Sequence, residues 1–261
     1  MPDWERSKLG RTGIEVGRLG ISASYGVPGR AVEQAFERGV NYIYWGTFRR
    51  GTFGEGLRNL APKRDRFVLV VQSYSRMATL LGWSLERALG KLHFSHADIL
   101  LLGLWNHRPP ARILDAARKL RERGLVRHLA VSTHQRPLVE HLAADSDISV
   151  VHVRYNAVHT GAEREVFPHL SSAQNRPGMV AFTATSWRQL LDPKRVPSGE
   201  KVPTAVDCYR FVLSNPAVDV CMTGPATEVQ SAEALKALDL GPMNEVELAW
   251  MRRVGEAIHK R

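Results

Sequence analysis

The chain alternates short apolar runs with longer stretches in which apolar residues recur every three or four positions. The apolar runs are typical of buried β-strands, and we expect strands at 18–22, 41–44, 67–71, 98–102, 126–132, 149–154, 179–183 and 218–222. The stretches between them predict amphipathic helices at 31–38, 84–92, 111–123, 138–143, 203–213, 228–238 and 244–258. Because the strands are apolar throughout rather than at alternate positions, they indicate a parallel sheet covered by helices.

The repetition of these units predicts how the sheet closes. About eight strand–helix units of roughly 30 residues favour an α/β fold of the (β/α)8 TIM barrel type. An open, doubly wound sheet is the alternative, but Tyr25-Gly26-Val27-Pro28-Gly29 after the first strand lacks the glycine spacing of a dinucleotide-binding turn. The segment 8–18 predicts an N-terminal β-hairpin that closes the bottom of the barrel. No linker divides the chain, so we expect a single domain over residues 1–261.

Composition places the chain among ordinary globular proteins, with 44% hydrophobic and 24% charged residues over 261 positions. No apolar run is long enough to span a bilayer, and the opening MPDWERSKLG lacks the apolar core of a signal peptide. The two cysteines, Cys208 and Cys221, stand in apolar segments and are expected to be free thiols. We therefore expect a cytoplasmic protein without a membrane partner.

The net charge of +10 raises the question of a nucleic-acid partner. However, the basic residues are scattered over predicted helix surfaces and are not interleaved with aromatic residues, as they are in single-strand binders. We expect no nucleic-acid partner. A small anionic ligand, such as a dinucleotide, makes better use of positive charge around a pocket. The sequence does not indicate an oligomeric state.

Several segments, in order along the chain, resemble the aldo-keto reductase family: LGRTGIEVGRLG, ERGVNYIYWGTFRRG, RDRFVLVVQ, LHFSHADILLLGL, GLVRHLAVST, VVHVRYNAVH and RFVLSNPAVDVCMTGP. The resemblance covers nearly the whole length. It implies a barrel whose active site lies at the C-terminal ends of the strands. It also implies that a nicotinamide cofactor, NADP or NAD, delivers a hydride to a carbonyl of a small-molecule substrate while a tyrosine supplies the proton.

The acid–base residues that the resemblance implies are replaced in this chain. Tyr44 stands at the aspartate position, Gln72 at the lysine position, Gly103 at the histidine position and Arg49 at the tyrosine position. The sequence thus predicts the frame of the family with a non-standard active site.

Other residues could take over the proton transfer. Tyr44 is the first candidate, and Arg49 or Arg50 in the next loop could lower its pKa. His107 is the second candidate, if the loop after the fourth strand carries it into the pocket. Each residue also has a structural interpretation: Tyr44 as an aromatic that closes the barrel top, and His107 as a loop residue ahead of a helix. Gln72 is expected to fill space and to form hydrogen bonds.

The resemblance also implies cofactor contacts. Ser132 and Thr133 replace the pair that binds the nicotinamide amide, His152 replaces a glutamine, and Phe182 replaces the stacking aromatic. Gly224 and Thr227 precede a helix whose N-terminus is placed to bind phosphate. Ala226 stands where the family has a basic residue for the 2′-phosphate, so the choice between NADP and NAD stays open.

Two alternatives to a reductase remain at the level of the sequence. One is a catalytically inactive or ligand-sensing barrel that keeps a nucleotide pocket. The other is a metal-dependent hydrolase with a zinc ion held by His107, His134 and His152 near three consecutive strand ends. The spacing of these histidines matches no metal motif, and we expect no metal.

Overall fold

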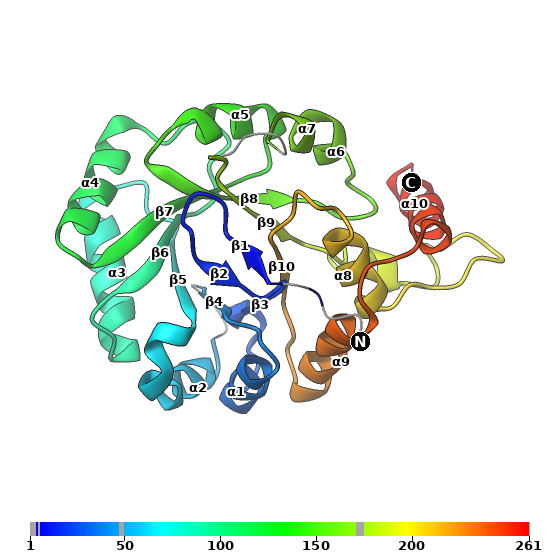
Figure 1. The fold of residues 1–261 in the computed structure, drawn as a ribbon, viewed down its shortest axis with the longest axis horizontal. Coiled ribbons are helices and arrows are strands. Elements are labelled where there is room, and N and C mark those ends of the chain that lie inside the picture. Colours follow the sequence, from blue (N-terminus) through cyan, green and yellow to red (C-terminus); the bar gives the residue numbers. More distant parts are fainter. Residues whose placement is uncertain (1–3, 5, 47–49, 171–174, 261) are drawn as a thin grey trace.

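Parallel strands close into a barrel in the computed structural model, which describes residues 4, 6–46, 50–170 and 175–260 (Figure 1). The neighbouring strands run in the order β10-β3-β4-β5-β6-β7-β8-β9. Their bounds are β3 Leu19–Ser22, β4 Tyr42–Trp45, β5 Val68–Ser73, β6 Ala97–Leu102, β7 Val126–Thr133, β8 Ile148–Arg154, β9 Gly178–Phe182 and β10 Val220–Thr223. Each pair is parallel, which confirms the predicted (β/α)8 fold.

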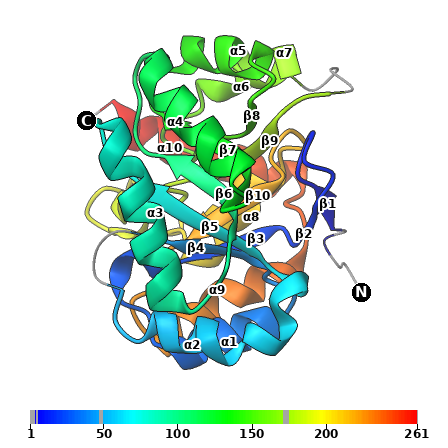
Figure 2. The ribbon, with the colours of Figure 1, turned by 90° about the vertical axis from the view of Figure 1, so that its left-hand side faces the viewer.

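Helices form the outer layer around this barrel (Figures 1 and 2). They are α1 Gly29–Glu37, α2 Phe53–Asn59, α3 Ala78–Leu92, α4 Ala111–Glu122, α5 Arg136–Ala144, α6 Ala162–Glu165, α7 Phe167–Leu170, α8 Ala205–Leu213, α9 Glu228–Leu240 and α10 Glu245–His259, with 3-10 turns η1 Ala23–Tyr25, η2 Ala61–Arg66 and η3 Gln189–Leu191. The helix expected at 84–92 was predicted too short, because α3 begins at Ala78. The short helices α2, α6 and α7 were not predicted at all.

The N-terminal hairpin closes one end of the barrel, as the sequence predicted. Strands β1 (Ser7–Lys8) and β2 (Glu15–Val16) pair antiparallel and lie across that end (Figure 2). Leu9 and Val16 are fully buried and belong to the same apolar cluster as Tyr42 and Val68 inside the barrel. The opposite end, where the strands reach their carboxyl termini, is therefore the barrel mouth.

Alternation along each strand decides which side chains reach this mouth. Val68 and Val70 of β5 pack in the interior cluster, whereas Leu69 and Val71 pack against the helices. Because successive side chains point to opposite faces, Gln72 continues the interior row and Ser73 continues the outer one. By the same rule Tyr44 and Ser132 reach the interior side of the mouth. No helix in the described part of the chain is long and apolar enough to cross a membrane.

Candidate active site

Tyr44 and Gln72 meet at the mouth as a hydrogen-bonded pair. The Tyr44 hydroxyl donates to Oε1 of Gln72, from the ends of the adjacent strands β4 and β5. Behind Tyr44, the hydroxyl of Ser24 also hydrogen-bonds to the phenol and receives a hydrogen bond of 2.9 Å from Ser22. Tyr44 and Gln72, which the sequence resemblance assigns to the aspartate and lysine positions of the family, thus touch each other as a neutral pair.

The surroundings of Tyr44 raise its pKa above the ordinary tyrosine range. Burial of the phenol is the largest cause, and the nearby Tyr74 acts in the same direction. Arg50 is close enough to lower the pKa, as the sequence suggested, but its effect is outweighed. Tyr44 is consequently a protonated phenol over the whole physiological pH range. Its partner Gln72 is itself buried and carries no charge.

Gly103 is a glycine because Gln72 occupies the space beside it. A Cβ atom at position 103 would lie 2.2 Å from Nε2 of Gln72 and 3.0 Å from the ring of Tyr74. The main-chain N–H of Gly103 donates to the Ser73 carbonyl oxygen at 2.9 Å, which holds the two strand ends together. A histidine at this position and Gln72 in its present conformation are mutually exclusive.

Of the other two predicted catalytic residues, His107 does not join this pair, and Arg49 lies outside the described residues. His107 is exposed: its Nδ1 lies 3.0 Å from the Arg108 carbonyl oxygen, and its ring packs edge-to-face on Trp105 at 5.2 Å. Among the described residues, no hydrogen bond or ring contact connects His107 with Tyr44 or Gln72. The geometry therefore favours the structural interpretation of His107.

Below the mouth, a second hydrogen bond crosses the barrel from β4 to β8. The hydroxyl of Tyr42 lies 2.8 Å from Nε2 of His152, and both residues are buried. Burial lowers the pKa of His152 to about 3, so its imidazole is neutral. His152, expected from the sequence to contact the cofactor, is placed in the barrel interior with one ring nitrogen already engaged.

Ser132 and Thr133 point to opposite faces of β7. Thr133 is buried on the helix side, where its hydroxyl accepts the main-chain N–H of Gln135 at 2.9 Å. Ser132 faces the mouth, and its hydroxyl makes no hydrogen bond with another described residue. Of the two predicted contacts to a nicotinamide amide, Ser132 is therefore the one with a hydroxyl available to a ligand.

Phe182 ends β9 at the mouth with its ring partly exposed. The ring packs edge-to-face with His134 at 5.4 Å, which leaves it as a flat apolar surface for stacking. Nδ1 of His134 is buried and lacks a hydrogen-bond partner within the described chain. Burial and the nearby Arg154 lower the pKa of His134, so this unpaired nitrogen belongs to a neutral ring.

Positive charge gathers beyond Phe182, in a group that the sequence reasoning missed. Burial, with smaller effects of the nearby Arg154 at the end of β8 and of Arg136, lowers the pKa of His159 to about 4. Arg154 also lies 5.9 Å from the ring of Trp187. The sequence shows basic and aromatic residues after strands β7, β8 and β9, but it does not show that these residues lie close together in the fold.

The loop after β9 has an unusual backbone. Thr183, Ser186, Trp187 and Arg188 all have positive φ angles, between 49° and 70°. Such conformations are costly for residues with a Cβ atom and are found preferentially at ligand sites. Here they turn the chain sharply beside Phe182 and place Trp187 on the surface.

Gly224 and Thr227 lie where β10 passes into α9. A Cβ atom at Gly224 would lie 2.6 Å from the ring of Tyr25, so the glycine allows this ring to pack over the loop. Thr227 caps α9 by accepting the N–H of Gln230 at 3.2 Å, and Oε1 of Gln230 in turn accepts the N–H of Ala226 at 2.8 Å. Two main-chain donors of this helix start are therefore already satisfied.

The three histidines of the zinc alternative do not converge. His152 lies inside the barrel with Tyr42, His107 is exposed on its loop, and His134 packs on Phe182. Within the described residues, no group of three or more histidine, cysteine, aspartate or glutamate side chains is close enough to hold a metal ion. Nothing in the described structure supports a metal-dependent hydrolase.

Comparison with known proteins places this barrel among related folds. The sequence model of the Aldo/keto reductase family matches residues 29–187. No curated protein matches the chain. Among solved structures, the chain is similar to an aldo-keto reductase of Bacillus halodurans in its holo form, with a TM-score of 0.80 at 15% identity over 98% of this chain and 99% of that one. It is also similar to an aldo/keto reductase of Klebsiella pneumoniae in complex with NADP and acetate, with a TM-score of 0.77 at 20% identity over 95% and 94% of the two chains.

Proposed function

The chain belongs to the aldo/keto reductase family, and from that premise we propose that it is an NAD(P)(H)-dependent oxidoreductase that reduces a carbonyl or similar small molecule at the barrel mouth. The observation that carries the proposal is the phenol of Tyr44, which stands at the mouth with a donor behind it (Ser24) and an acceptor beside it (Gln72). A hydroxyl held in this way can serve as a proton donor to a substrate oxygen.

The residues across the mouth fit the nicotinamide half of the cofactor. The unengaged hydroxyl of Ser132 suits the carboxamide, and the flat ring of Phe182 suits stacking on the nicotinamide ring. When bound, the cofactor would supply the hydride. Fewer main-chain donors remain for the phosphates of the cofactor, because two N–H groups near Thr227 already form hydrogen bonds within the protein. The complex of the Klebsiella pneumoniae protein with NADP supports the cofactor class, whereas Ala226 leaves NAD and NADP both open.

In this mechanism Tyr44 exchanges one acceptor for another. Before a substrate binds, the Tyr44 hydroxyl donates its hydrogen bond to Oε1 of Gln72. When the substrate binds, its oxygen replaces Oε1 as the acceptor. As the substrate oxygen gains negative charge, Tyr44 transfers its proton to it, and a proton from solvent then returns to the phenolate through the hydroxyl of the partly exposed Ser24, which Ser22 holds in place. The raised pKa keeps Tyr44 protonated but makes it a weak acid. We therefore expect slow turnover that is independent of pH between about 6 and 9.

One observation favours a second candidate, a ligand-sensing barrel without catalysis. Among the described residues no charged side chain is hydrogen-bonded to Tyr44 or Gln72, and burial outweighs the effect of Arg50, so the pKa of Tyr44 stays raised and the usual means of activating a tyrosine is weakened. Such a protein would bind a nicotinamide nucleotide at Ser132 and Phe182 and transfer no hydride.

Two measurements test the proposal in order. Quenching of tryptophan fluorescence by NADPH and NADH measures binding, and we expect a saturable change with at least one of them. Failure of both to bind at millimolar concentration would contradict the oxidoreductase and the nucleotide sensor alike. Single-turnover oxidation of the bound cofactor with a panel of aldehydes and quinones then measures hydride transfer.

The variant Tyr44→Phe separates catalysis from binding. We expect it to lower kcat by about 100-fold, the usual contribution of a general acid, and to leave cofactor affinity unchanged. His107→Gln is the matched control and should retain the parent rate. If Tyr44→Phe turns over as fast as the parent, Tyr44 is not the proton donor.

A further inference from the structure

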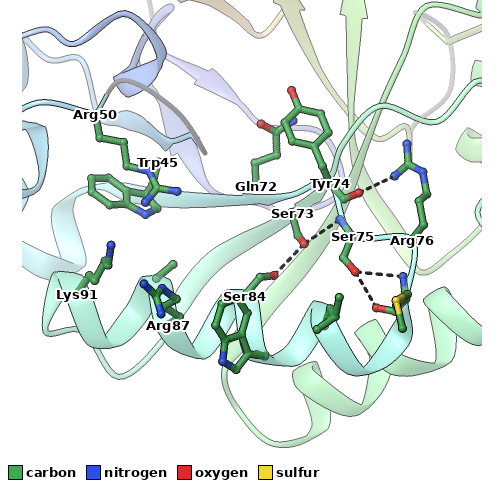
Figure 3. A pocket seen from close by; sticks show the side chains of 14 residues that line it. Trp45, Arg50, Gln72, Ser73, Tyr74, Ser75, Arg76, Ser84, Arg87 and Lys91 are labelled. Carbon is green, nitrogen blue, oxygen red and sulfur yellow. Dashed lines mark hydrogen bonds between the residues drawn. The ribbon is translucent and has the colours of Figure 1, made fainter.

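A cavity opens on the side of the barrel, between α3 and the ends of β4 and β5 (Figure 3). We call it the α3 pocket. Its volume is about 670 Å³, and it is lined by Trp45, Arg50, Gln72, Ser73, Tyr74, Ser75, Arg76, Met77, Leu80, Trp83, Ser84, Arg87, Ala88 and Lys91. It shares Gln72 with the Tyr44–Gln72 pair and includes Tyr74 and Arg50, which lie near Tyr44, and it extends outward from there along the exposed face of α3.

The charge of this pocket is entirely of one sign. Arg50, Arg87 and Lys91 lie together around Trp45 (Figure 3), and no carboxylate is among the lining residues. Arg87 is close enough to Arg50 to lower its pKa further, although burial is the larger cause. Glu86, the acidic neighbour on α3, is turned away to a 2.7 Å ion pair with Arg123. Like charges held together without a counter-charge are costly, and a bound anion relieves that cost.

The fourth cation of the pocket has a different role. Arg76 lies on the opposite side (Figure 3), where its guanidinium donates to the carbonyl oxygens of Gly103 at 2.8 Å and Leu104 at 2.6 Å. It also stacks on Trp105 at 3.9 Å. These contacts explain Arg76 as a structural residue. No comparable hydrogen bonds to backbone or carboxylate hold Arg87 and Lys91 within the described chain.

The pocket also offers flat and apolar surface. The Trp83 side chain is 56% exposed, and Met77 and Leu80 on the same helix are 58% and 47% exposed. Arg87 lies 5.1 Å from the centre of the Trp83 ring, and Arg50 lies 4.5 Å from that of Trp45. Exposed apolar side chains concentrated beside a charged pocket are typical of a binding site.

One buried donor in the wall lacks a partner. Nε1 of Trp45 is buried and makes no hydrogen bond with any described residue, although Trp45 itself lines the pocket and is only 5% exposed. An unpaired buried N–H costs about 1–3 kcal/mol, so such groups usually mark a place where a ligand or water completes the bonding.

We propose that the α3 pocket binds a small organic anion that has a planar or apolar body and one acidic group. The acidic group lies between Arg50, Arg87 and Lys91 and accepts the indole N–H of Trp45. The body packs on Trp83, Leu80 and Met77. A carboxylate, a sulfonate and a phosphate share the chemistry that these residues recognise.

The fluorescent sulfonate 8-anilinonaphthalene-1-sulfonate is the probe that tests this proposal, and its uncharged parent N-phenyl-1-naphthylamine is the matched ligand. We expect one saturable sulfonate site per chain, with energy transfer from tryptophan, and binding about tenfold weaker for the uncharged parent. Equal affinity for the two probes would overturn the proposal, because it would show that the cations do not take part.

Three variants localise the site on the molecule. Arg87→Gln and Lys91→Gln should each weaken sulfonate binding by about tenfold, since each removes one charged contact. Arg164→Gln removes the same charge from an exposed position on α6 and should leave the affinity within about twofold of the parent. The proposal is wrong if Arg87→Gln and Lys91→Gln both bind as the parent does, or if Arg164→Gln loses as much affinity as they do. Thermal unfolding followed by circular dichroism confirms that each variant is folded.

Discussion

The two sides of the barrel mouth differ in whether their polar side chains contact one another or face the open mouth. On the β4–β6 side, Tyr44 is hydrogen-bonded to Gln72, and Gln72 leaves no room for a side chain at Gly103. On the β7–β9 side, the Ser132 hydroxyl makes no hydrogen bond with another described residue, and the Phe182 ring is partly exposed, with the positive charge of Arg154 nearby. One side is closed by contacts within the protein, and the other is available for contacts with a ligand.

This difference separates two roles that the family combines. The closed side is where the resemblance places the acid–base residues, and the residues that stand there in the structure, Tyr44, Gln72 and Gly103, are neutral. The open side is where the resemblance places the nicotinamide, and groups suited to it remain. Apart from the neutral Tyr42–His152 pair, the described interior below the mouth is packed with apolar side chains, so the fold does not depend on which polar residues stand above it. Cofactor binding and proton transfer can therefore diverge independently.

The largest expected effect comes from adding a side chain on the closed side. Gly103→His should lower the free energy of unfolding by about 3 kcal/mol, because a Cβ atom there overlaps Gln72. Chemical denaturation measures the change. Removing the obstacle in the double variant Gln72→Ala/Gly103→His should recover part of the loss.

Gly82→Ala is the matched control for this substitution. Gly82 lies within α3, and its Cβ atom would meet only the Leu120 side chain at an ordinary 3.5 Å. The exchange should stabilise the protein by about 0.5–1 kcal/mol through helix propensity. If Gly103→His were tolerated as well as Gly82→Ala, the closed side would be looser than the structure indicates.

The next effect concerns the Tyr42–His152 hydrogen bond, which connects the two sides beneath the mouth. The pKa of His152 is about 3 in the folded protein, against about 6.5 for an unfolded histidine. Between these values the unfolded state binds the proton more tightly, so stability falls as the pH falls from about 6.5 toward 3. The contribution of this one group is about 1.4 kcal/mol per pH unit.

His152→Gln removes the titrating group and keeps a hydrogen-bond partner for Tyr42. Denaturation curves between pH 4 and pH 7 should therefore show that the free energy of unfolding falls less steeply with decreasing pH in the variant than in the parent. The difference in slope should be roughly that of one bound proton, about 1.4 kcal/mol per pH unit. Parallel curves for the two proteins would mean that His152 titrates normally and is not sealed inside the barrel.

The smallest expected effect is on the open side. Phe182→Ala should weaken nicotinamide nucleotide binding by about tenfold, because it removes a stacking surface, and should leave the Tyr44–Gln72 pair intact. Fluorescence titration measures the affinity. Phe182→Tyr keeps the flat ring and should bind as the parent does. An unchanged affinity in Phe182→Ala would remove the distinction between the open and closed sides.

The sequence predicted the barrel well because strand positions follow from continuous apolar runs. It missed α2 because Gly54 and Gly56 disfavour a helix, yet Gly56 is needed where a Cβ atom would lie 2.3 Å from the carbonyl oxygen of Gly29. It also missed the first turns of α3, where exposed Leu80 and Trp83 break the amphipathic pattern. Tertiary contacts outweighed local preference at both places.

The sequence could predict which residues lie at the strand ends of the candidate site, but not how their side chains are oriented or bonded. That Tyr44 and Gln72 lie side by side follows from their places at the ends of adjacent strands. That the phenol is bonded to the amide, that Thr133 faces outward, and that His107 stays on the surface depend on side-chain direction and on loop packing. A sequence pattern of apolar and polar residues does not specify these, because polar residues at strand ends are compatible with either face.

The contact between Gln72 and position 103 also constrains how this protein can change over generations. Returning to the charged residues of the family requires at least three exchanges, and each one alone is unfavourable. We expect an aspartate at 44 to bury a carboxylate with only Arg50 nearby, a lysine at 72 to bury an ammonium beside a neutral phenol, and a histidine at 103 to collide with Gln72. We expect each single exchange to destabilise the protein, so the neutral arrangement would resist reversal one residue at a time.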